Sequence, residues 1–380
     1  MNWKKKSRND WGRLGLNSNK SSKWAISDFV EIIGGGTPKT SISEYWNGSI
    51  PWLSVKDFGN DDRYVFETEK TITNEGLNNS STKLLQKDDI IISARGTVGE
   101  LAMLPFPMAF NQSCYGIRPK DDSIDKTFLY YLLRNSVQLL RKNTHGSVFD
   151  TITRDTFKGI EVEVPSIEEQ VKIAGILSSL DDKIAENKKI NHHLEQIAKA
   201  IFYEKFGNQV PNGLLGDLAS VSSGKRPPIK VSERTATEDI PILGAASIMG
   251  YTSKSLYSEK ILVTGRVGTH GIIQRYNRPC WPSDNALVLK SDDYELVYQN
   301  LLSIDFSSMN RGSTQPLITQ TDLKNVAIYI PTQIELSDFE DTVGTIMQQY
   351  ESNIVENESL VQLRDSLLPK LMSGEISVTD

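Results

Sequence analysis

The stretch that decides the fold runs from Pro165 to Phe206 and reads PSIEEQVKIAGILSSLDDKIAENKKINHHLEQIAKAIFYEKF. Ser166 and Glu169 have the spacing of a capping box, in which the serine side chain accepts the glutamate amide and the glutamate reaches back to the serine amide. Gly207 follows, and it can end a helix in the left-handed conformation that other residues resist. The stretch therefore predicts one helix, about 60 Å long.

Apolar or small residues recur along this helix in alternating steps of four and three. That spacing is typical of a heptad seam. The seam positions are Ile173, Leu177, Leu180, Ile184, Asn187, Asn191, Leu194, Ala198 and Ile201. A seam of this length needs a partner helix.

A second copy of the helix closes the chain, after Pro331. Thr332 and Glu335 form a second capping box. A shift of 170 places the seam on Val343, Met347, Tyr350, Ile354, Asn357, Val361, Arg364, Leu368 and Leu371. Asn187 and Asn357 are equivalent, and a buried asparagine in a seam fixes register at a cost in stability. The two helices are expected to pair antiparallel and to hold the globular segments at the two ends of a rod.

Length and composition predict a multidomain protein of the reducing cytoplasm. A chain of 380 residues is long for one domain. It has no run of about eighteen apolar residues that could cross a membrane, and its basic start lacks the apolar core of a secretory signal. The two cysteines, Cys114 and Cys280, indicate no disulfide framework, and the cysteines and four histidines show no metal-ligand spacing.

The net charge of −6 is unevenly distributed. Residues 1–160 hold 22 Lys/Arg and 18 Asp/Glu, whereas residues 333–380 hold 2 and 10. The acidic excess therefore lies on the helices. Because local charge decides which surface can approach phosphates, the overall balance does not exclude a nucleic-acid partner.

The segment before each long helix is also repeated. Strand-like runs of Ile, Val and Tyr alternate with Gly, Asn and Asp turns, which predicts two α+β modules. Residues 261–268 (ILVTGRVG) match the run that begins at Ile90, and residues 312–319 (GSTQPLIT) match residues 146–153 (GSVFDTIT). The offset falls from about 190 to about 171 between residues 55 and 90, which predicts an insertion in the first copy near Lys56 to Gly76.

The motifs GGGTPKTSISEYWNGSIPWLS, RGTVG, GSVFDTIT and LRDSLLPKLMSGEISV, set among two duplicated helices, resemble the DNA-specificity (S) subunit of type I restriction–modification systems. The resemblance covers nearly the whole chain after residue 24. It implies a basic N-terminal head at 1–23, target-recognition domain 1 at 24–165, helix 1 at 166–207, target-recognition domain 2 at 208–331, and helix 2 with the C-terminal tail at 332–380. One departure is the second loop, SSGKRPPIK, which lacks the glycine-rich form.

The resemblance also implies a function in host defence. Each domain would read one half of a bipartite, asymmetric site on double-stranded DNA, and an antiparallel coiled coil would set the spacer. Two methylation subunits would dock on the coil and carry adenine methylation with S-adenosylmethionine, and restriction subunits would join for cleavage. The chain itself would bind no cofactor and would be non-catalytic.

Polar and basic residues on the repeated loops are the candidates for DNA contact. Arginine can bond guanine in the major groove twice, asparagine or glutamine can do so with adenine, and lysine can contact phosphate. The candidates are Lys39, Arg95, Thr97, Asn111, Gln112, Lys225, Arg226, Arg266, Thr269 and Asn285. Arg95, Thr97, Arg266 and Thr269 are assigned to equivalent turns. For each residue, the alternative is a solvated hairpin without a ligand.

Three further alternatives stay open. The glycine run Gly34–Gly36 fits either a structural turn or a close approach to DNA, and Trp46 and Trp52 fit a core better than base stacking. A scaffold that binds proteins through the acidic helices is the rival function. An enzyme is disfavoured because the chain has no Asn/Asp-Pro-Pro-aromatic tetrapeptide, no phosphate-binding glycine loop and no nucleophile–base set.

Overall fold

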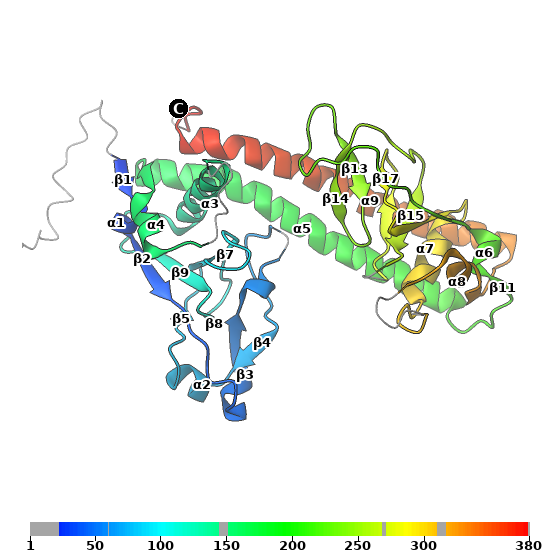
Figure 1. Ribbon diagram of the computed structural model, residues 1–380, viewed down its shortest axis with the longest axis horizontal. Coiled ribbons are helices and arrows are strands. Elements are labelled where there is room, and N and C mark those ends of the chain that lie inside the picture. The colour runs from blue at the N-terminus through cyan, green and yellow to red at the C-terminus, as the bar shows by residue number, and fades with distance from the viewer. Residues whose placement is uncertain (1–22, 60, 144–150, 268–270, 310–316, 379–380) are drawn as a thin grey trace, which may run out of the picture. The chain divides into compact units, whose positions relative to one another are not determined.

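The computed structural model describes residues 23–378 except 60, 144–150, 268–270 and 310–316 (Figure 1). The chain forms two compact units. Unit 1 comprises residues 1–186 and 356–380, and unit 2 comprises residues 187–355. Each unit contains one globular module and one part of each long helix, so the duplication in the sequence reappears as two similar units.

The two long helices are α5 (Ile167–Phe206) and α9 (Gln333–Met372). Both predicted capping boxes are present. The Ser166 amide donates to Glu169 Oε2 at 3.0 Å, and the Thr332 amide donates to Glu335 Oε2 at 2.9 Å. The return bonds, from the Glu169 and Glu335 amides to the hydroxyls, are 3.3 and 3.4 Å.

Gly207 directly follows α5, as predicted, but the predicted reason for a glycine at that position is wrong. Gly207 is not among the residues with positive φ, so it does not end α5 in the left-handed conformation. A Cβ at Gly207 would instead lie 2.6 Å from the Tyr203 carbonyl oxygen, so glycine is needed there for space. The left-handed glycine is at the other helix end, where Gly374 has φ of 72° just after α9.

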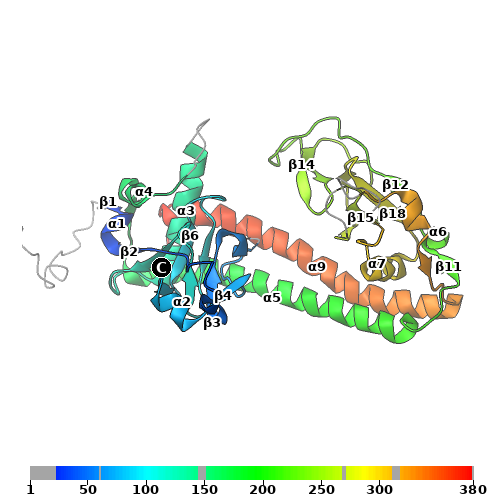
Figure 2. The same ribbon diagram turned by 60° about the horizontal axis from the view of Figure 1, so that its bottom comes forward.

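In each unit α5 and α9 run side by side and antiparallel (Figures 1 and 2). In unit 1, Lys172 bonds the Val378 carbonyl, whereas Lys183 pairs with Glu356, so residue numbers rise on one helix as they fall on the other. Unit 2 repeats this direction, since Asn191 bonds Asn353 and Lys205 pairs with Asp338.

The predicted seam is partly correct. The buried members of the predicted seams are Ile173, Leu177, Ile184, Asn187, Asn191, Ala198, Val343, Met347, Arg364, Leu368 and Leu371. Other predicted positions are only half-buried: Leu180, Leu194, Ile201, Tyr350, Ile354, Asn357 and Val361. Two physical reasons account for this: a straight α-helix drifts away from a strict heptad repeat, and the modules pack on the pair and widen its buried face. That wider face also takes in Asp181, Phe202, Phe206 and Phe339.

The module of unit 1 consists of small sheets and one substantial helix. A four-stranded antiparallel sheet has the order β2-β9-β6-β7, and β1 pairs with β10. A mixed four-stranded sheet has the order β4-β3-β8-β5, in which β3 and β8 are parallel. The strands are β1 (Lys23–Ala25), β2 (Val30–Gly34), β3 (Trp46–Leu53), β4 (Lys70–Ile72), β5 (Leu84–Leu85), β6 (Ile90–Ser93), β7 (Leu101–Met103), β8 (Met108–Phe110), β9 (Cys114–Pro119) and β10 (Glu161–Glu163). The helices are α1 (Ile26–Phe29), α2 (Asn74–Asn78), α3 (Lys126–Asn143) and α4 (Arg154–Gly159), with 3-10 turns η2 (Ser43–Tyr45) and η3 (Val55–Asp57).

The module of unit 2 has the same plan. Its four-stranded sheet has the order β12-β18-β15-β16, a three-stranded sheet has the order β14-β13-β17, and β11 pairs with β19. The strands are β11 (Gly213–Leu214), β12 (Ser220–Ser223), β13 (Ile240–Leu243), β14 (Ile248–Thr252), β15 (Ile261–Gly265), β16 (Gln274–Tyr276), β17 (Trp281–Pro282), β18 (Ala286–Lys290) and β19 (Ala327–Ile328). The helices are α6 (Leu215–Leu218), α7 (Tyr294–Ser303) and α8 (Gln320–Lys324).

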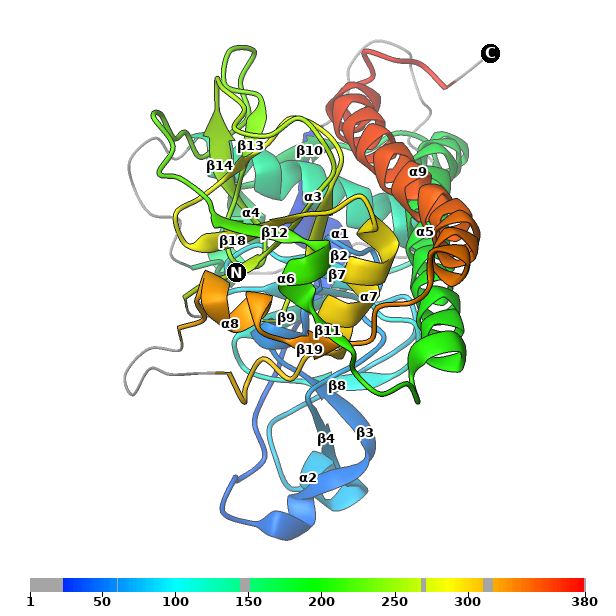
Figure 3. The same cartoon turned by 90° about the vertical axis from the view of Figure 1, so that its right-hand side faces the viewer.

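One helix in each module joins the sheet to the long helices. In unit 1, Phe128 and Leu129 of α3 share a buried cluster with Ile173, Leu177 and Leu368. In unit 2, residues of α7 such as Leu296 and Val297 share a cluster with α5 and α9 (Figure 3). The modules are therefore continuous with the helical cores on which they lie.

The predicted insertion is present in unit 1. Residues 54–69 separate β3 from β4, whereas residues 244–247 separate the corresponding strands β13 and β14. The extra segment includes η3, and hydrogen bonds to the Asp57 carboxylate hold its two ends together. One Asp57 oxygen accepts the Ser54 amide at 2.6 Å, and the other accepts the Glu69 amide at 2.7 Å.

Candidate nucleic-acid interface

Three loops of unit 1 meet at one end of its four-stranded sheet. They follow β2 (residues 35–42), follow β6 (residues 94–100) and link β8 to β9 (residues 111–113). The Gly36 amide donates to the Phe110 carbonyl at 3.0 Å, and the Ala94 amide donates to the Ser113 carbonyl at 2.7 Å. These backbone bonds hold the three loops together.

The glycine run is required mainly by packing within the protein. A Cβ at Gly35 would overlap the Asn111 carbonyl oxygen, and one at Gly36 would overlap Ser81 and Thr82, whereas nothing lies within 4 Å of a Cβ at Gly34. The Trp52 indole NH donates to the Gly36 carbonyl at 3.1 Å. Packing within the protein therefore accounts for glycine at Gly35 and Gly36.

Both tryptophans near this run belong to the core, as expected. Trp52 is buried, and Trp46 is half-buried in the same apolar cluster. Their rings meet edge to face with centroids 5.2 Å apart. Such a pair stabilises the base of the loop cluster.

Unit 2 repeats the close contact between the first and third loops, but the indole that supports it lies on β17, whereas Trp52 lies on β3. The Lys225 amide donates to the Pro282 carbonyl at 3.0 Å, and the Trp281 indole donates to the Lys225 carbonyl at 2.7 Å. A Cβ at Gly224 would overlap the Ser283 carbonyl, as one at Gly35 would overlap that of Asn111. The loop SSGKRPPIK thus keeps the one glycine that the close approach requires.

The residue-by-residue match of the Arg95 and Arg266 turns is wrong by one position. The Arg266 amide donates to the Asn285 carbonyl and the Arg266 carbonyl accepts the Ile318 amide. In unit 1 those bonds are made by Ala94, with Ser113 and Ile152. The turns are equivalent, but Arg95 corresponds to Val267. Because the two turns have similar composition, the sequence did not fix the alignment within them.

The remaining candidates lie on the surface of the two loop clusters. Lys39, Arg95, Thr97, Gln112, Lys225, Arg226 and Asn285 are exposed, whereas Asn111 and Arg266 are half-buried. Thr269 lies outside the described residues. Gln112 accepts a hydrogen bond from the Thr37 hydroxyl, which ties the first loop to the third.

The arginines divide into two groups by partner. Arg63, Arg118, Arg134, Arg275 and Arg364 each form ion pairs within their own unit. Within the described residues, Arg95, Arg226 and Arg266 form none, and neither do Lys39 and Lys225. An exposed cation without a protein partner keeps its charge and its donors for a polyanion.

In unit 1 the loops surround an open hollow of about 380 Å³. Arg95 and Asn111 line it, as do Lys56 and Lys70, which the sequence had not indicated as candidates. Both lysines belong to or border the segment inserted after β3. Basic residues within an insertion could have been noticed in the sequence, but no pattern in it placed them beside Arg95.

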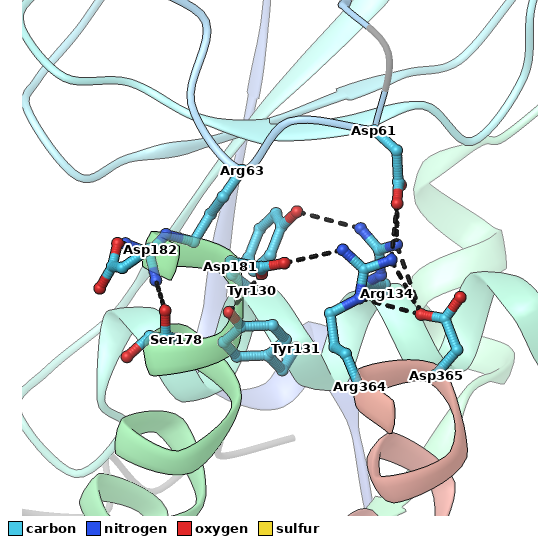
Figure 4. A network of polar contacts seen from close by, with 10 residues as sticks. All are labelled: Asp61, Arg63, Tyr130, Tyr131, Arg134, Ser178, Asp181, Asp182, Arg364 and Asp365. Atoms are coloured by element: carbon cyan, nitrogen blue, oxygen red, sulfur yellow. Dashed lines mark hydrogen bonds and ion pairs between the residues drawn. The ribbon is translucent and has the colours of Figure 1, made fainter. Parts of the chain in front are cut away.

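An ionic network joins the module of unit 1 to the helices α5 and α9 (Figure 4). The Arg364 guanidinium on α9 donates to Asp181 on α5 and to Asp61 in the inserted segment, each at 2.7 Å. Arg134 on α3 also donates to Asp61, at 2.6 Å. Burial alone would raise the pKa of Asp61, but Arg134 and Arg364 outweigh it and lower that pKa.

Unit 2 holds its module by a different set of charges. Arg275 of β16 donates to both carboxylate oxygens of Glu295, at 2.6 and 2.7 Å, and to Glu351 on α9 at 2.8 Å. Its guanidinium also lies over the Tyr294 and Tyr298 rings, 4.9 and 4.6 Å from their centroids. Burial alone would lower the pKa of Arg275, but the bonds to Glu295 raise it, so the side chain stays charged.

The helix seam of unit 2 contains a polar layer. Asn353 Nδ2 donates to Asn191 Oδ1 at 2.8 Å, and Asn191 Nδ2 donates to the Tyr350 carbonyl at 3.1 Å. Asn187 is buried and Asn357 is half-buried. The register role of Asn187 and Asn357 stays a prediction, and the Asn191–Asn353 pair is a further candidate for it.

Gln170 and Glu340, 170 positions apart, anchor the start of the module helices. Gln170 Oε1 accepts the Asp125 amide at 2.9 Å, and Glu340 Oε1 accepts the Leu296 amide at 2.8 Å. Burial raises the pKa of Glu340 to about 7, and nearby Glu295 and Asp293 add to the effect. Glu340 lines a cavity, and Lys260, Lys290, Glu259 and Asp292 line the same cavity.

We expect the variant Glu340→Gln to gain stability relative to the native chain as pH rises from 5 to 8. The folded pKa is raised, so the folded state binds more protons than the unfolded state, and native stability falls as pH rises through about 7. Thermal unfolding at several pH values checks this. Asp341→Asn, at the exposed neighbour, is the control; parallel pH profiles for Glu340→Gln and the native chain would contradict it.

Among the residues that the structure describes, neither a metal-ligand cluster nor a membrane span accompanies these features. In the part of the chain that the structure describes, no group of three or more His, Cys, Asp or Glu residues could hold a metal ion. Across those same residues, no helix has both the length and the apolar character needed to span a bilayer.

The chain contains two similar α+β modules. Each carries a loop cluster whose exposed cations form no ion pair among the described residues. This arrangement is that of a duplicated recognition protein. The family model described as the type I restriction modification DNA specificity domain matches residues 20–196 and 212–363. The chain therefore belongs to the family of type I restriction–modification specificity (S) subunits, and the predicted α+β fold with two similar modules and two long helices is confirmed.

Known relatives agree with this assignment. The chain is 29% identical to the type I restriction enzyme MjaIX specificity subunit of Methanocaldococcus jannaschii, over 93% of each chain. It is 24% identical to the EcoprrI specificity subunit of Escherichia coli, over 84% of this chain and 87% of that one. The crystal structure of the type I S subunit of M. genitalium matches with a TM-score of 0.56 at 18% identity, covering 96% of this chain and 99% of that one.

Proposed function

We propose that each unit reads one half of a bipartite, asymmetric site on double-stranded DNA, and that the chain carries out no chemistry itself. The observation that carries the proposal is the repeated loop cluster. The same backbone bonds build it in both units, and each copy presents exposed cations that have no ion pair among the described residues. Because the polar side chains differ between the copies, the two halves of the site would differ in sequence.

The methylation chemistry is assigned to partner subunits. Two methylation subunits, holding S-adenosylmethionine, would dock on the paired helices, and restriction subunits would join them for cleavage. The support is the family membership. The rival function, a scaffold that acts through the acidic helices without touching DNA, has no support from the relatives, which are named as specificity subunits.

DNA binding by the complex with methylation subunits distinguishes these functions. A recognition subunit predicts an affinity that falls steeply with salt, with a log–log slope that reflects several phosphate contacts. The same complex should bind the motif that it methylates with an affinity orders of magnitude higher than that for unrelated duplexes. Equal, weak affinity for every sequence would contradict the proposal.

The length of the long helices is expected to set the spacer between the half-sites. Both helices pass through both units. Inserting seven residues after Glu186 and seven after Val355 adds about 10 Å of helix, which corresponds to about three base pairs. Sequencing of methylated sites should then show a longer spacer between unchanged half-sites.

An insertion in one helix alone is the control for this experiment. It shifts the seam of α5 against that of α9, so it should reduce methylation without defining a new spacer. An unchanged spacer in the double insertion would reject the role of the helices as a ruler, while leaving the reading of half-sites intact.

A further inference from the structure

The hollow of unit 1 presents an unusual set of hydrogen-bonding groups, and we propose that it reads a guanine through Arg95 and Asn111. The inference rests on the proposed function, in which unit 1 reads one half-site. It adds the residues that decide one position of that half-site and the base that they select. The argument depends on which polar groups in the hollow are already occupied by the protein.

Two donor groups in the hollow are available. Arg95 is exposed, and its guanidinium has no hydrogen bond or ion pair among the described residues. Asn111 has its carbonyl oxygen engaged, because Oδ1 accepts the Ser113 amide at 3.0 Å. Within the described part of the chain, the Asn111 NH2 group has no such bond, and Asn111 lines the same hollow as Arg95.

The principal acceptor of the hollow is occupied. Both oxygens of Asp57 are used by the Ser54 and Glu69 amides, and the Ser54 hydroxyl adds a third bond at 2.8 Å. Glu69 lies on the rim, with its carboxylate 3.9 Å from the Lys56 ammonium. The remaining walls include the apolar side chains of Trp52 and Val55. The centre therefore offers donors against an apolar wall.

Hydrogen bonds fix the backbone that carries the two donors. The Asn111 amide donates to the Leu53 carbonyl at 2.9 Å, and the Arg95 amide donates to the Ser113 carbonyl at 3.3 Å. Gly96, with φ of 83°, closes the turn directly after Arg95. A fixed backbone at both positions lowers the conformational entropy lost on binding, which favours their use in selecting a base.

Guanine is the base whose edge matches two donors. In the major groove it presents the N7 and O6 acceptors side by side, whereas adenine presents an acceptor and a donor, and cytosine presents a donor. Lys56 and Lys70 also line the hollow, and their ammonium groups can contact flanking phosphates, which position the duplex without selecting its sequence.

The donor pair belongs to unit 1 alone. The equivalent positions of unit 2 hold Val267 and Ser283, because Ser283 bonds Leu243 as Asn111 bonds Leu53. Valine has no donor, and Ser283 is 1% exposed. Guanine selection by these two donors is therefore confined to the half-site that unit 1 reads.

The proposal is tested by measuring how the complex of the full-length chain and methylation subunits binds DNA. The duplexes are varied at each position of the unit 1 half-site. Arg95→Ala should weaken binding to the native site roughly tenfold to hundredfold and remove the preference at one guanine. Asn111→Asp keeps the oxygen that accepts the Ser113 amide but replaces the donor with an acceptor, so it should disfavour guanine at that position. Lys158→Ala, on exposed α4, should change neither.

Two outcomes would overturn the proposal. One is uniform weakening over all sequences with a salt slope reduced by about one, which is the signature of a phosphate contact. The other is an unchanged base preference in both variants. In either case a native complex that still selects a bipartite motif would leave the proposed function standing, whereas a native complex without sequence preference would defeat both.

Discussion

Replacing Arg364 with alanine is expected to lower the free energy of unfolding of unit 1 by about 3–5 kcal/mol. The Arg364 side chain is 2% exposed and is paired with Asp181, which is 6% exposed. Without the guanidinium, Asp181 is left as a buried charge whose remaining bond comes from the Tyr131 hydroxyl. Asp61 keeps Arg134 but loses its second partner. Hydrogen exchange of α3 and of the first half of α5 in the full chain measures the loss.

Lys183→Ala is the matched control for Arg364→Ala. Lys183 pairs with Glu356 across the same two helices at 3.5 Å, but both side chains are nearly half exposed. Exposed pairs contribute about 0–1 kcal/mol. The double variant Asp181→Leu with Arg364→Met should recover most of the stability, since apolar residues can replace a buried ion pair. Equal stability of Arg364→Ala and the native chain would show that the network does not hold the module.

Arg275→Ala is expected to destabilise unit 2 by a similar amount, about 3–5 kcal/mol. The side chains of Arg275 and Glu295 are 5% and 4% exposed. Removing the guanidinium leaves Glu295 without its two charge-assisted bonds and also removes the contacts with the Tyr294 and Tyr298 rings. Faster hydrogen exchange is expected in α7 and β16, with α3 unchanged.

Two further variants sharpen the Arg275 test. Arg275→Lys retains the charge but cannot donate in parallel to both Glu295 oxygens, so it should recover only part of the stability. Lys205→Ala removes the pair with Asp338 on the helices of unit 2, where the side chains are 37% and 62% exposed, and should have little effect. Exchange in α3 that rises as much as exchange in α7 would contradict the assignment of Arg275 to unit 2.

Much of the fold could be predicted from local signals. The capping boxes at Ser166 and Thr332 fixed where the long helices begin, because capping is decided within four residues. The change in offset between the two copies located the inserted segment. The strand Ile90–Ser93 begins where the predicted run begins, because its residues favour a buried strand.

What could not be predicted depends on contacts between residues distant in sequence. Arg364 was placed on the seam correctly, but its partner Asp61 is 303 positions away, and no periodicity connects them. The drift of the seam toward Phe202 and Phe206 reflects the modules that cover it. The hollow beside Arg95 needs residues from the inserted segment, whose path the sequence does not determine.

The most direct measurement of the central claim is sequencing of DNA methylation in cells that express this chain with its methylation subunit. The native chain should methylate one bipartite, asymmetric motif. Replacing residues 208–331 with the second module of another family member should change one half of the motif and leave the other half and the spacer unchanged. A change in both halves, or in neither, would contradict independent reading by the two units.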